Sequence, residues 1–207
     1  MVASIGKVMN DRWTTFLSES KLRVFDFDDT LVKTDAVIRV KDPEGKEFTL
    51  TPGEFAQHKL DDSNQYDFSE FEQANLINPR EIKKVTKVLR NVLNAGGERE
   101  VAILTARTPA AQQSIEEYLE DIGIDPENVN IVLVGTSDPA AKANWIENKI
   151  VDGATDILFL DDSGKNIAAV RDLKNKYPDV KIDARVANYG EELAEGIVNE
   201  VASSEIQ

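Results

Sequence analysis

The stretch LRVFDFDDTLV, residues 22–32, joins a strand-forming apolar run to a group of carboxylates. The run LRVFDF (22–27) is continuous rather than alternating, which is typical of a strand covered by helices on both faces. Asp26, Asp28 and Asp29 lie at its end, where like charges at short range repel one another. The stretch therefore raises the question of what relieves this repulsion.

Similar apolar runs recur along the chain and alternate with helical patterns. We expect further strands at EVAILT (100–105), NIVLVG (130–135), DILFLD (156–161) and the shorter KIDARVA (181–187), and helices within residues 78–97, 108–123, 137–150 and 164–178. Strand–helix alternation of this kind predicts an α/β fold with a doubly wound, mostly parallel, Rossmann-like sheet. Ligands of such sheets bind beyond the carboxyl ends of the strands.

One segment interrupts the alternation and predicts the domain organisation. Residues 35–78 contain VIRVKDPEGKEFTL, which indicates a β-hairpin turning at residues 43–45. This segment follows directly after the acidic strand end. It would form either a small cap over the site or a solvent-exposed insertion with no role in function. The core would then comprise residues 21–34 and 79–190. Residues 1–20 would be an N-terminal extension and residues 191–207 a C-terminal helix or tail.

Composition restricts the classes of function. The chain has 207 residues, of which 41% are hydrophobic, too many for a disordered protein. Its net charge of −14 would repel an extended nucleic acid, so only a nucleic-acid end or a small anion is expected as a partner. The absence of cysteine excludes thiolate catalysis and Cys-ligated metals. No apolar run approaches the ~18 residues of a membrane span, and we expect a cytoplasmic protein without membrane contact.

Polar side chains follow four of the predicted strands. Asp26 ends the first strand, Thr105 the second and the Asp161–Asp162 pair the fourth, while the third leads to Lys142 near the start of a helix. In a parallel sheet these groups gather at one edge. Carboxylates beside a hydroxyl and a lysine suit a hard, oxygen-seeking cation next to a phosphate. Mg²⁺ would also relieve the repulsion among the carboxylates.

At these residues the chain resembles the haloacid dehalogenase superfamily of phosphohydrolases. The D-x-D-x-T motif of that family is matched by DFDDTL, its strand ending in Thr or Ser by AILTAR, and its strand ending in an acidic pair by ILFLDDSGKN. With the lysine near a helix start, the motifs occur in family order over residues 22–166. In motif style the chain is most similar to nucleotide and polynucleotide-end phosphatases, which carry a similar Thr/Ser-x-Arg.

The resemblance implies a role for each matched residue. Asp26 would be the nucleophile that forms an aspartyl-phosphate, and Asp28 the general acid and base. Thr105 and Lys142 would hold the phosphate oxygens. The metal ligands would be the carboxylates of Asp26 and Asp161 and the backbone carbonyl of Asp28, with Asp162 supporting the metal.

Two questions about basic residues stay open: which lysine contacts the phosphate, and what role Arg107 has. Lys142 and Lys149 share one side of their helix, two turns and about 10.5 Å apart, and a helix running antiparallel to the strands would bring Lys142 to the site. Lys165, in the loop after Asp162, is a further candidate. Arg107 would be either a second phosphate donor or a partner in a salt bridge that anchors its loop.

The resemblance implies a Mg²⁺-dependent phosphomonoester hydrolase acting on a nucleotide or another small phosphorylated molecule. A phosphoreceiver domain uses similar residues, but its acidic pair comes early and its Lys last, unlike the order here. A dehalogenase would need no Mg²⁺ and therefore no acidic set. A non-catalytic binding or structural protein that keeps this fold is the alternative, and activity on an aryl phosphate would distinguish it.

Overall fold

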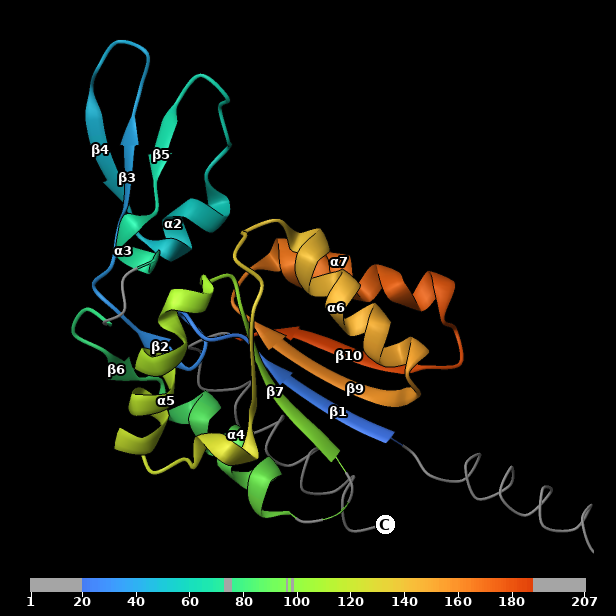
Figure 1. Ribbon diagram of the computed structural model, residues 1–207. Helices are drawn as coiled ribbons and strands as arrows, with labels where there is room; N and C mark the ends of the chain where they lie inside the picture. The colour runs from blue at the N-terminus through green and yellow to red at the C-terminus, as the bar shows by residue number, and fades with distance from the viewer. Residues whose placement is uncertain (1–19, 73–75, 96, 98, 188–207) are drawn as a thin grey trace, which may run out of the picture.

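The computed structural model describes residues 20–72, 76–95, 97 and 99–187. Of the predicted terminal segments 1–20 and 191–207, only Ser20 lies within this part, and it begins the first strand of the core instead of ending an extension. Within the described part, five parallel strands form the central sheet in the order β10-β9-β1-β7-β8 (Figure 1). Their bounds are Ser20–Phe25 (β1), Arg99–Thr105 (β7), Asn130–Leu133 (β8), Ala154–Asp161 (β9) and Lys181–Val186 (β10). All five predicted strands are confirmed.

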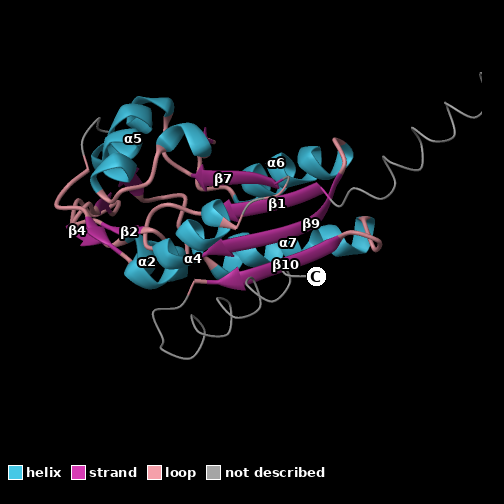
Figure 2. Cartoon of the chain, turned by 90° about the horizontal axis from the view of Figure 1, so that it is seen from below, coloured by secondary structure: helices cyan, strands magenta, loops and turns pink. Residues whose placement is uncertain are grey.

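Helices cover both faces of this sheet. Figure 2 shows β7, β1, β9 and β10 side by side, with helices on either side of them. The helices are α4 (Lys83–Asn94) and α5 (Gln112–Asp121) on one face, and α6 (Pro139–Val151) and α7 (Gly164–Lys176) on the other. Because side chains alternate along a strand, Phe25 packs with α4 and α5, whereas Leu22 and Val24 pack with α6 and α7. The predicted doubly wound arrangement is confirmed.

The helices of the second face begin at the carboxyl ends of the strands because each follows a strand of a parallel sheet, and a cap fixes the residue at which each begins. Asp138 accepts a hydrogen bond from the backbone N–H of Ala140 at 2.9 Å, and Pro139 occupies the first turn of α6. Ser163 accepts from the backbone N–H of Asn166 at the start of α7. These caps direct the first turns of α6 and α7 toward the acidic strand ends.

The first predicted helix starts later than its sequence pattern indicates. Residues 80–81 form a short strand, β6 (Arg80–Glu81), which pairs antiparallel with β2 (Val32–Lys33), and α4 begins only at Lys83. The backbone N–H of Asp35 also donates to the carbonyl of Ile77 at 3.0 Å. The two chain segments that enter and leave residues 35–78 are thus held side by side.

Residues 35–78 carry a separate three-stranded antiparallel sheet of order β4-β3-β5. The predicted hairpin is present as β3 (Ile38–Lys41) and β4 (Glu47–Leu50), and Gly45 supplies the positive φ of +86° that its turn requires. The strand β5 (Gln65–Asp67) and the short helices α2 (Pro52–Gln57) and α3 (Ser69–Glu72) were not predicted. We call residues 36–76 the insert; it stands at the carboxyl end of the central sheet (Figure 1).

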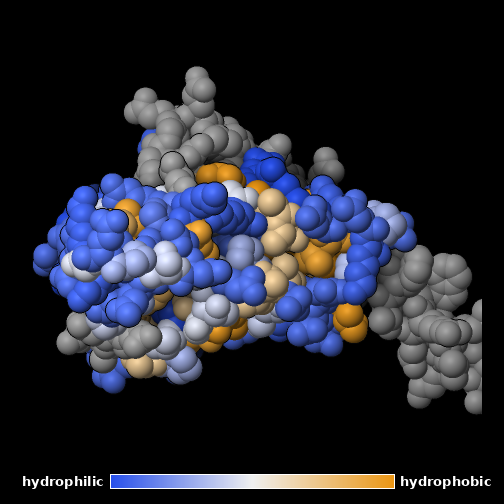
Figure 3. Space-filling view, turned by 90° about the horizontal axis from the view of Figure 1, so that it is seen from above, coloured by the Kyte–Doolittle hydropathy of each residue, from blue (hydrophilic) through white to orange (hydrophobic). Residues whose placement is uncertain are grey.

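The surface of the molecule is mostly polar. Seen from above, hydrophilic residues cover most of the described surface and hydrophobic residues fill smaller areas between them (Figure 3). Among the described residues, no helix combines the length and the apolar character needed to cross a bilayer.

Candidate functional site

The predicted strand-end residues meet around one cavity. Its volume is about 650 Å³, and the core contributes Asp26, Asp28, Thr105, Lys142 and Asp162 to its wall. They meet because parallel strands present all their carboxyl ends at one edge, and because α6 starts there. Asp161 is completely buried directly beneath this group.

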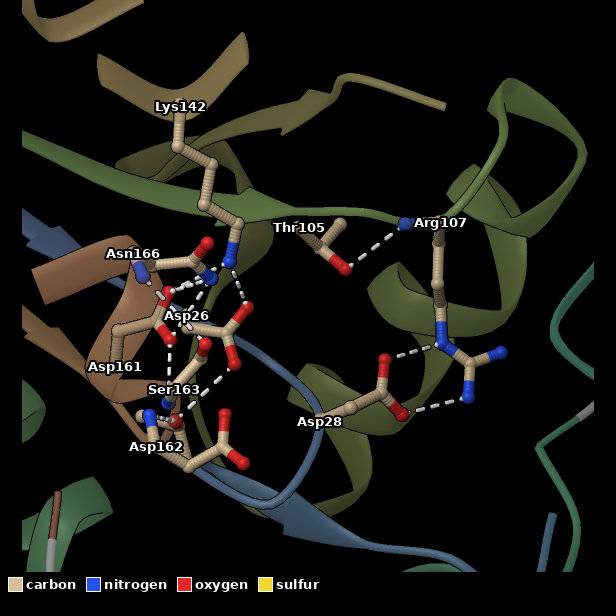
Figure 4. Close-up of polar contacts among 10 residues, drawn as sticks. Asp26, Asp28, Thr105, Arg107, Lys142, Asp161, Asp162, Ser163 and Asn166 are labelled. Carbon is tan, nitrogen blue, oxygen red and sulfur yellow. Dashed lines mark hydrogen bonds and ion pairs between the residues drawn. The ribbon is translucent and has the colours of Figure 1, made fainter. Parts of the chain in front are cut away.

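Lys142 lies between two carboxylates of different strands (Figure 4). Its Nζ donates to Asp26 Oδ1 at 2.5 Å and to Asp161 Oδ2 at 2.7 Å. Lys149 instead pairs with Glu100 at the amino-terminal end of β7, where its Nζ lies 2.8 Å from Oε2. Lys165 lines the same cavity as Lys142. The structure therefore brings Lys142 and Lys165 to the cavity and directs Lys149 away from it.

Asp161 and Asp26 are also held by neighbouring side chains and backbone groups, of which Asn166 and Ser163 were not predicted from the sequence. The amide nitrogen of Asn166 donates to both carboxylate oxygens of Asp161 at 3.0 Å, and the backbone N–H of Ser163 donates to Oδ1 at 2.8 Å. The hydroxyl of Thr30 donates to Asp26 Oδ2 at 3.2 Å. The signal for the first two was the Ser-x-x-Asn spacing directly after the acidic pair, which makes Ser163 the N-cap of α7 and places Asn166 in its first turn.

The electrostatics of this cluster leave negative charge in excess. Burial raises the pKa of Asp26 well above its usual value, Lys142 opposes this rise, and Asp161 and Asp162 add to it. Burial, with the charges of Asp161 and Asp29, raises the pKa of Asp162 to about 7. Burial alone would lower the pKa of Lys142, but its two carboxylate partners outweigh burial and raise it. One ammonium group thus faces three carboxylates.

The three carboxylates fit a metal ion. Asp26, Asp161 and Asp162 each offer an oxygen, and these oxygens lie within 4.8 Å of one another. Hard divalent cations such as Mg²⁺ prefer such oxygen ligands, and a cation here would neutralise the excess charge. The side-chain carboxylate of Asp28 is not part of this group; its predicted contribution was the backbone carbonyl.

The loop after β1 is tightly folded and turns Asp28 away from the cluster. The backbone N–H groups of Leu31 and Val32 donate to the carbonyl of Phe27 at 2.8 and 3.1 Å. Asp29 has a φ of +53°, a left-handed region that favours glycine over other residues. The turn leaves the carboxylate of Asp28 at the opposite side of the site from Lys142 (Figure 4).

Asp28 forms a bidentate salt bridge with Arg107. Nε and one terminal nitrogen of Arg107 each lie 2.8 Å from a carboxylate oxygen of Asp28. Of the two alternatives for Arg107, the salt bridge is therefore present, and it anchors Asp28 itself. A contact between Arg107 and phosphate stays a prediction.

Arg107 is buried although it lines the cavity, with 3% of its surface exposed. Its guanidinium carbon lies 5.9 Å from the ring centre of Phe27 and 5.4 Å from that of Phe71, which belongs to α3 of the insert. Its remaining terminal nitrogen points away from Asp28 (Figure 4) and has no hydrogen-bond partner within the described part of the chain. The insert and Asp28 thus contact the same side chain.

Thr105 is completely buried at the end of β7 and lines the cavity. Its hydroxyl accepts a hydrogen bond from the backbone N–H of Arg107 at 3.2 Å. The carbonyl of Thr105 accepts from the N–H of Val134, which ties the loops after β7 and β8 together. Among the residues that the structure describes, the Thr105 hydroxyl donates to no acceptor, so its proton can be donated into the cavity.

Comparison with known proteins identifies no family. No family model matches the chain, and no curated protein matches it. Among solved structures, the crystal structure of the Legionella pneumophila effector Ceg4 with an N-terminal yeast Hog1p sequence is similar, with a TM-score of 0.48 and 16% identity over 90% of this chain and 96% of that one. Similarity of this degree assigns neither a family nor a function.

Proposed function

We propose that this protein is a Mg²⁺-dependent phosphomonoester hydrolase that acts through an aspartyl-phosphate on Asp26. The observation that carries the proposal is the convergence of Asp26, Lys142, Asp161 and Asp162 at the carboxyl edge of a parallel sheet, with Asp28 across the same cavity. The order of these residues in the chain resembles that of the haloacid dehalogenase superfamily, in which the same residue types perform this reaction.

Asp26, Asp161 and Asp162 would hold the metal. Bound there, Mg²⁺ would neutralise charge on the phosphate and keep Asp26 ionised. The hydrogen bonds from Asn166 and Ser163 support this assignment because they fix the orientation of Asp161, as expected around a metal ligand.

The chemistry divides into two displacements at phosphorus. In the first, a carboxylate oxygen of Asp26 attacks phosphorus, the ester bond breaks, and Asp28 gives its proton to the departing oxygen. In the second, Asp28 takes a proton from a water molecule whose oxygen attacks the same phosphorus, and the bond to Asp26 breaks. Inorganic phosphate and the free alcohol are the products. Thr105 and Lys142 would donate hydrogen bonds to the phosphoryl oxygens throughout.

The ion pair with Arg107 sets a condition on this scheme. Both oxygens of Asp28 accept from Arg107, so at least one of these bonds must open before Asp28 can transfer a proton. A phosphate contact by Arg107 would require the same opening, unless it used the nitrogen that has no partner among the described residues. The proposal therefore includes a shift of Arg107 or Asp28 when substrate binds.

The same contacts favour one alternative, a binding protein without turnover. Lys142 satisfies Asp26, and Arg107 satisfies Asp28, so both acids have partners before any ligand binds. Such closed ion pairs are also what a non-catalytic member of this fold would keep.

The test is hydrolysis of phenyl phosphate by the full chain with Mg²⁺. We expect turnover that stops with excess chelator and is lost in Asp26→Asn, because an amide is a poor nucleophile. Asp152→Asn is the matched control, since Asp152 is exposed at the end of α6 and does not line the cavity. Undiminished activity in the Asp26 variant would exclude the covalent scheme, and folded but inactive wild-type protein would favour the binding alternative.

A further inference from the structure

The two walls of the cavity differ in chemistry. The core supplies mostly acids, hydroxyls and cations, together with the small or apolar residues Ala106, Gly135 and Pro139. The insert supplies only apolar side chains among the described residues that line the cavity. These residues are Ile38, Pro52, Phe55, Leu60, Phe68 and Phe71, and we call them the apolar wall.

Aromatic rings dominate the apolar wall. Phe55 packs edge-on against Phe68, with ring centres 5.2 Å apart at an angle of 84°. Phe71 lies against Arg107, the partner of Asp28. All three rings are only partly buried, so each keeps surface that a ligand can cover.

The position of the wall decides which part of a ligand it meets. In the proposed reaction the phosphate lies at Asp26 and Lys142, and the leaving oxygen lies next to Asp28. Phe71 and Asp28 both contact Arg107, so the apolar wall begins beside the leaving oxygen. The first group of the substrate beyond the oxygen would therefore face aromatic and aliphatic side chains.

Packing within the insert does not account for the whole wall. Leu60 is 57% exposed, and within the described part of the chain the exposed large hydrophobic residues are Leu60 and Val151. Leu60 lines the cavity, whereas Val151 lies at the far end of α6. An exposed apolar side chain in a polar surface is informative when it adjoins a cavity of ligand size.

We infer that the substrate is a phosphomonoester with a flat, apolar leaving group, that is, an aryl phosphate; this inference rests on the proposed function. An aromatic leaving group would bury apolar surface and pack against the Phe rings. The hydroxyls of a sugar or polyol would instead lose their hydrogen bonds to water against the same wall. The apolar wall thus favours an aryl ester over the nucleotide that the motif style suggests.

The experiment compares 2-naphthyl phosphate with phenyl phosphate. The two leaving groups have similar acidity, so the ratio of their kcat/KM values reports contact with the wall rather than intrinsic reactivity. We expect the wild-type chain to favour the naphthyl ester by about fivefold, from the apolar area of the second ring.

Two variants test whether the wall causes the preference. Leu60→Gln and Phe68→Gln should each lower the naphthyl-to-phenyl ratio at least about twofold. Val151→Gln, the same kind of change at an exposed residue outside the cavity, should leave it unchanged. Circular dichroism checks the Phe68 variant, and if that variant fails to fold, the Leu60 variant decides.

The outcomes separate this inference from the proposed function. A wild-type ratio near one, or a ratio that neither folded variant lowers, overturns the inference while hydrolysis itself stands. If neither ester is hydrolysed, the dissociation constants of the two esters, measured by calorimetry, replace the rates. Suppose the protein binds the naphthyl ester more tightly than the phenyl ester, and Leu60→Gln reduces this difference. The apolar wall would then be supported as the binding surface, and only the proposed hydrolase activity would be refuted.

Discussion

At the residue scale, the site is a set of opposed charges that satisfy one another. Lys142 relieves part of the repulsion between Asp26 and Asp161, and Arg107 does the same for Asp28. A buried charge that loses its partner is costly, so each of these residues affects both stability and chemistry. A substitution of Arg107 can test the role of Asp28 separately, because Arg107 pairs with the proposed general acid and not with the nucleophile Asp26.

We expect Arg107→Lys to lower the turnover of phenyl phosphate about tenfold or more, because a lysine cannot hold both oxygens of Asp28 at once. If Arg107 positions Asp28, kcat should fall more than KM rises, and the pH dependence of kcat should change. Steady-state kinetics over a pH series measure both effects. A rise in KM alone would indicate that Arg107 binds the substrate instead.

The turn at Asp29 provides a second test at this scale. Its φ of +53° favours glycine, and its charge adds to the repulsion around Asp162. Asp29→Gly should therefore leave the free energy of unfolding within about 0.5 kcal/mol of wild type, whereas Asp29→Val should lower it by about 1–2 kcal/mol. Urea denaturation measures both, and equal effects of the two substitutions would contradict the backbone explanation.

At the scale of elements, the insert is a unit attached through a narrow base. The strands β2 and β6 pair at that base, and Asp35 and Ile77 share a backbone hydrogen bond beyond it. The hairpin alone is not a separable unit, because β3 lies between β4 and β5 and buries Ile38 and Val40. In the proposed enzyme, the reacting groups would lie in the core and the contacts to the leaving group in the insert.

Replacing residues 36–76 by two glycines, so that Asp35 is joined to Ile77, should leave the central sheet folded. The core clusters on both faces of the sheet would be retained, except for Leu76, which packs at the edge of one of them. Activity on phenyl phosphate should persist within about tenfold, but the naphthyl preference should vanish, because the phosphate contacts stay and the leaving-group contacts go. Loss of the far-UV circular dichroism of the core would show that the insert is required for folding.

At the scale of the whole molecule, the fold gathers three carboxylates around one ammonium group. The negative charge that Lys142 does not neutralise favours a cation at this site, and the clustered carboxylates supply its ligands. A ligand that binds only the folded state raises the free energy of unfolding through mass action. Global stability should therefore report metal binding without any assay of activity.

We expect Mg²⁺ at about a hundred times its dissociation constant to raise the free energy of unfolding by about 2.7 kcal/mol. Asp162→Asn should raise Tm in chelator, because it removes one of three clustered charges, and should shrink the rise that Mg²⁺ causes. Thermal unfolding of wild type, Asp162→Asn and the control Asp152→Asn measures these effects. If Mg²⁺ shifted all three equally, the ion would not bind at the cluster.

The parallel sheet, and the edge at which Asp26, Thr105, Lys142 and the Asp161–Asp162 pair meet, could be predicted from the sequence. Continuous apolar runs and helix-start signals are local, and parallel strands then bring their carboxyl ends together. The partners across the site and the apolar wall of the insert became known only from the three-dimensional structure. Arg107 meets Asp28 over 79 residues of chain and Lys142 meets Asp26 over 116, and no local periodicity encodes pairings at such separations.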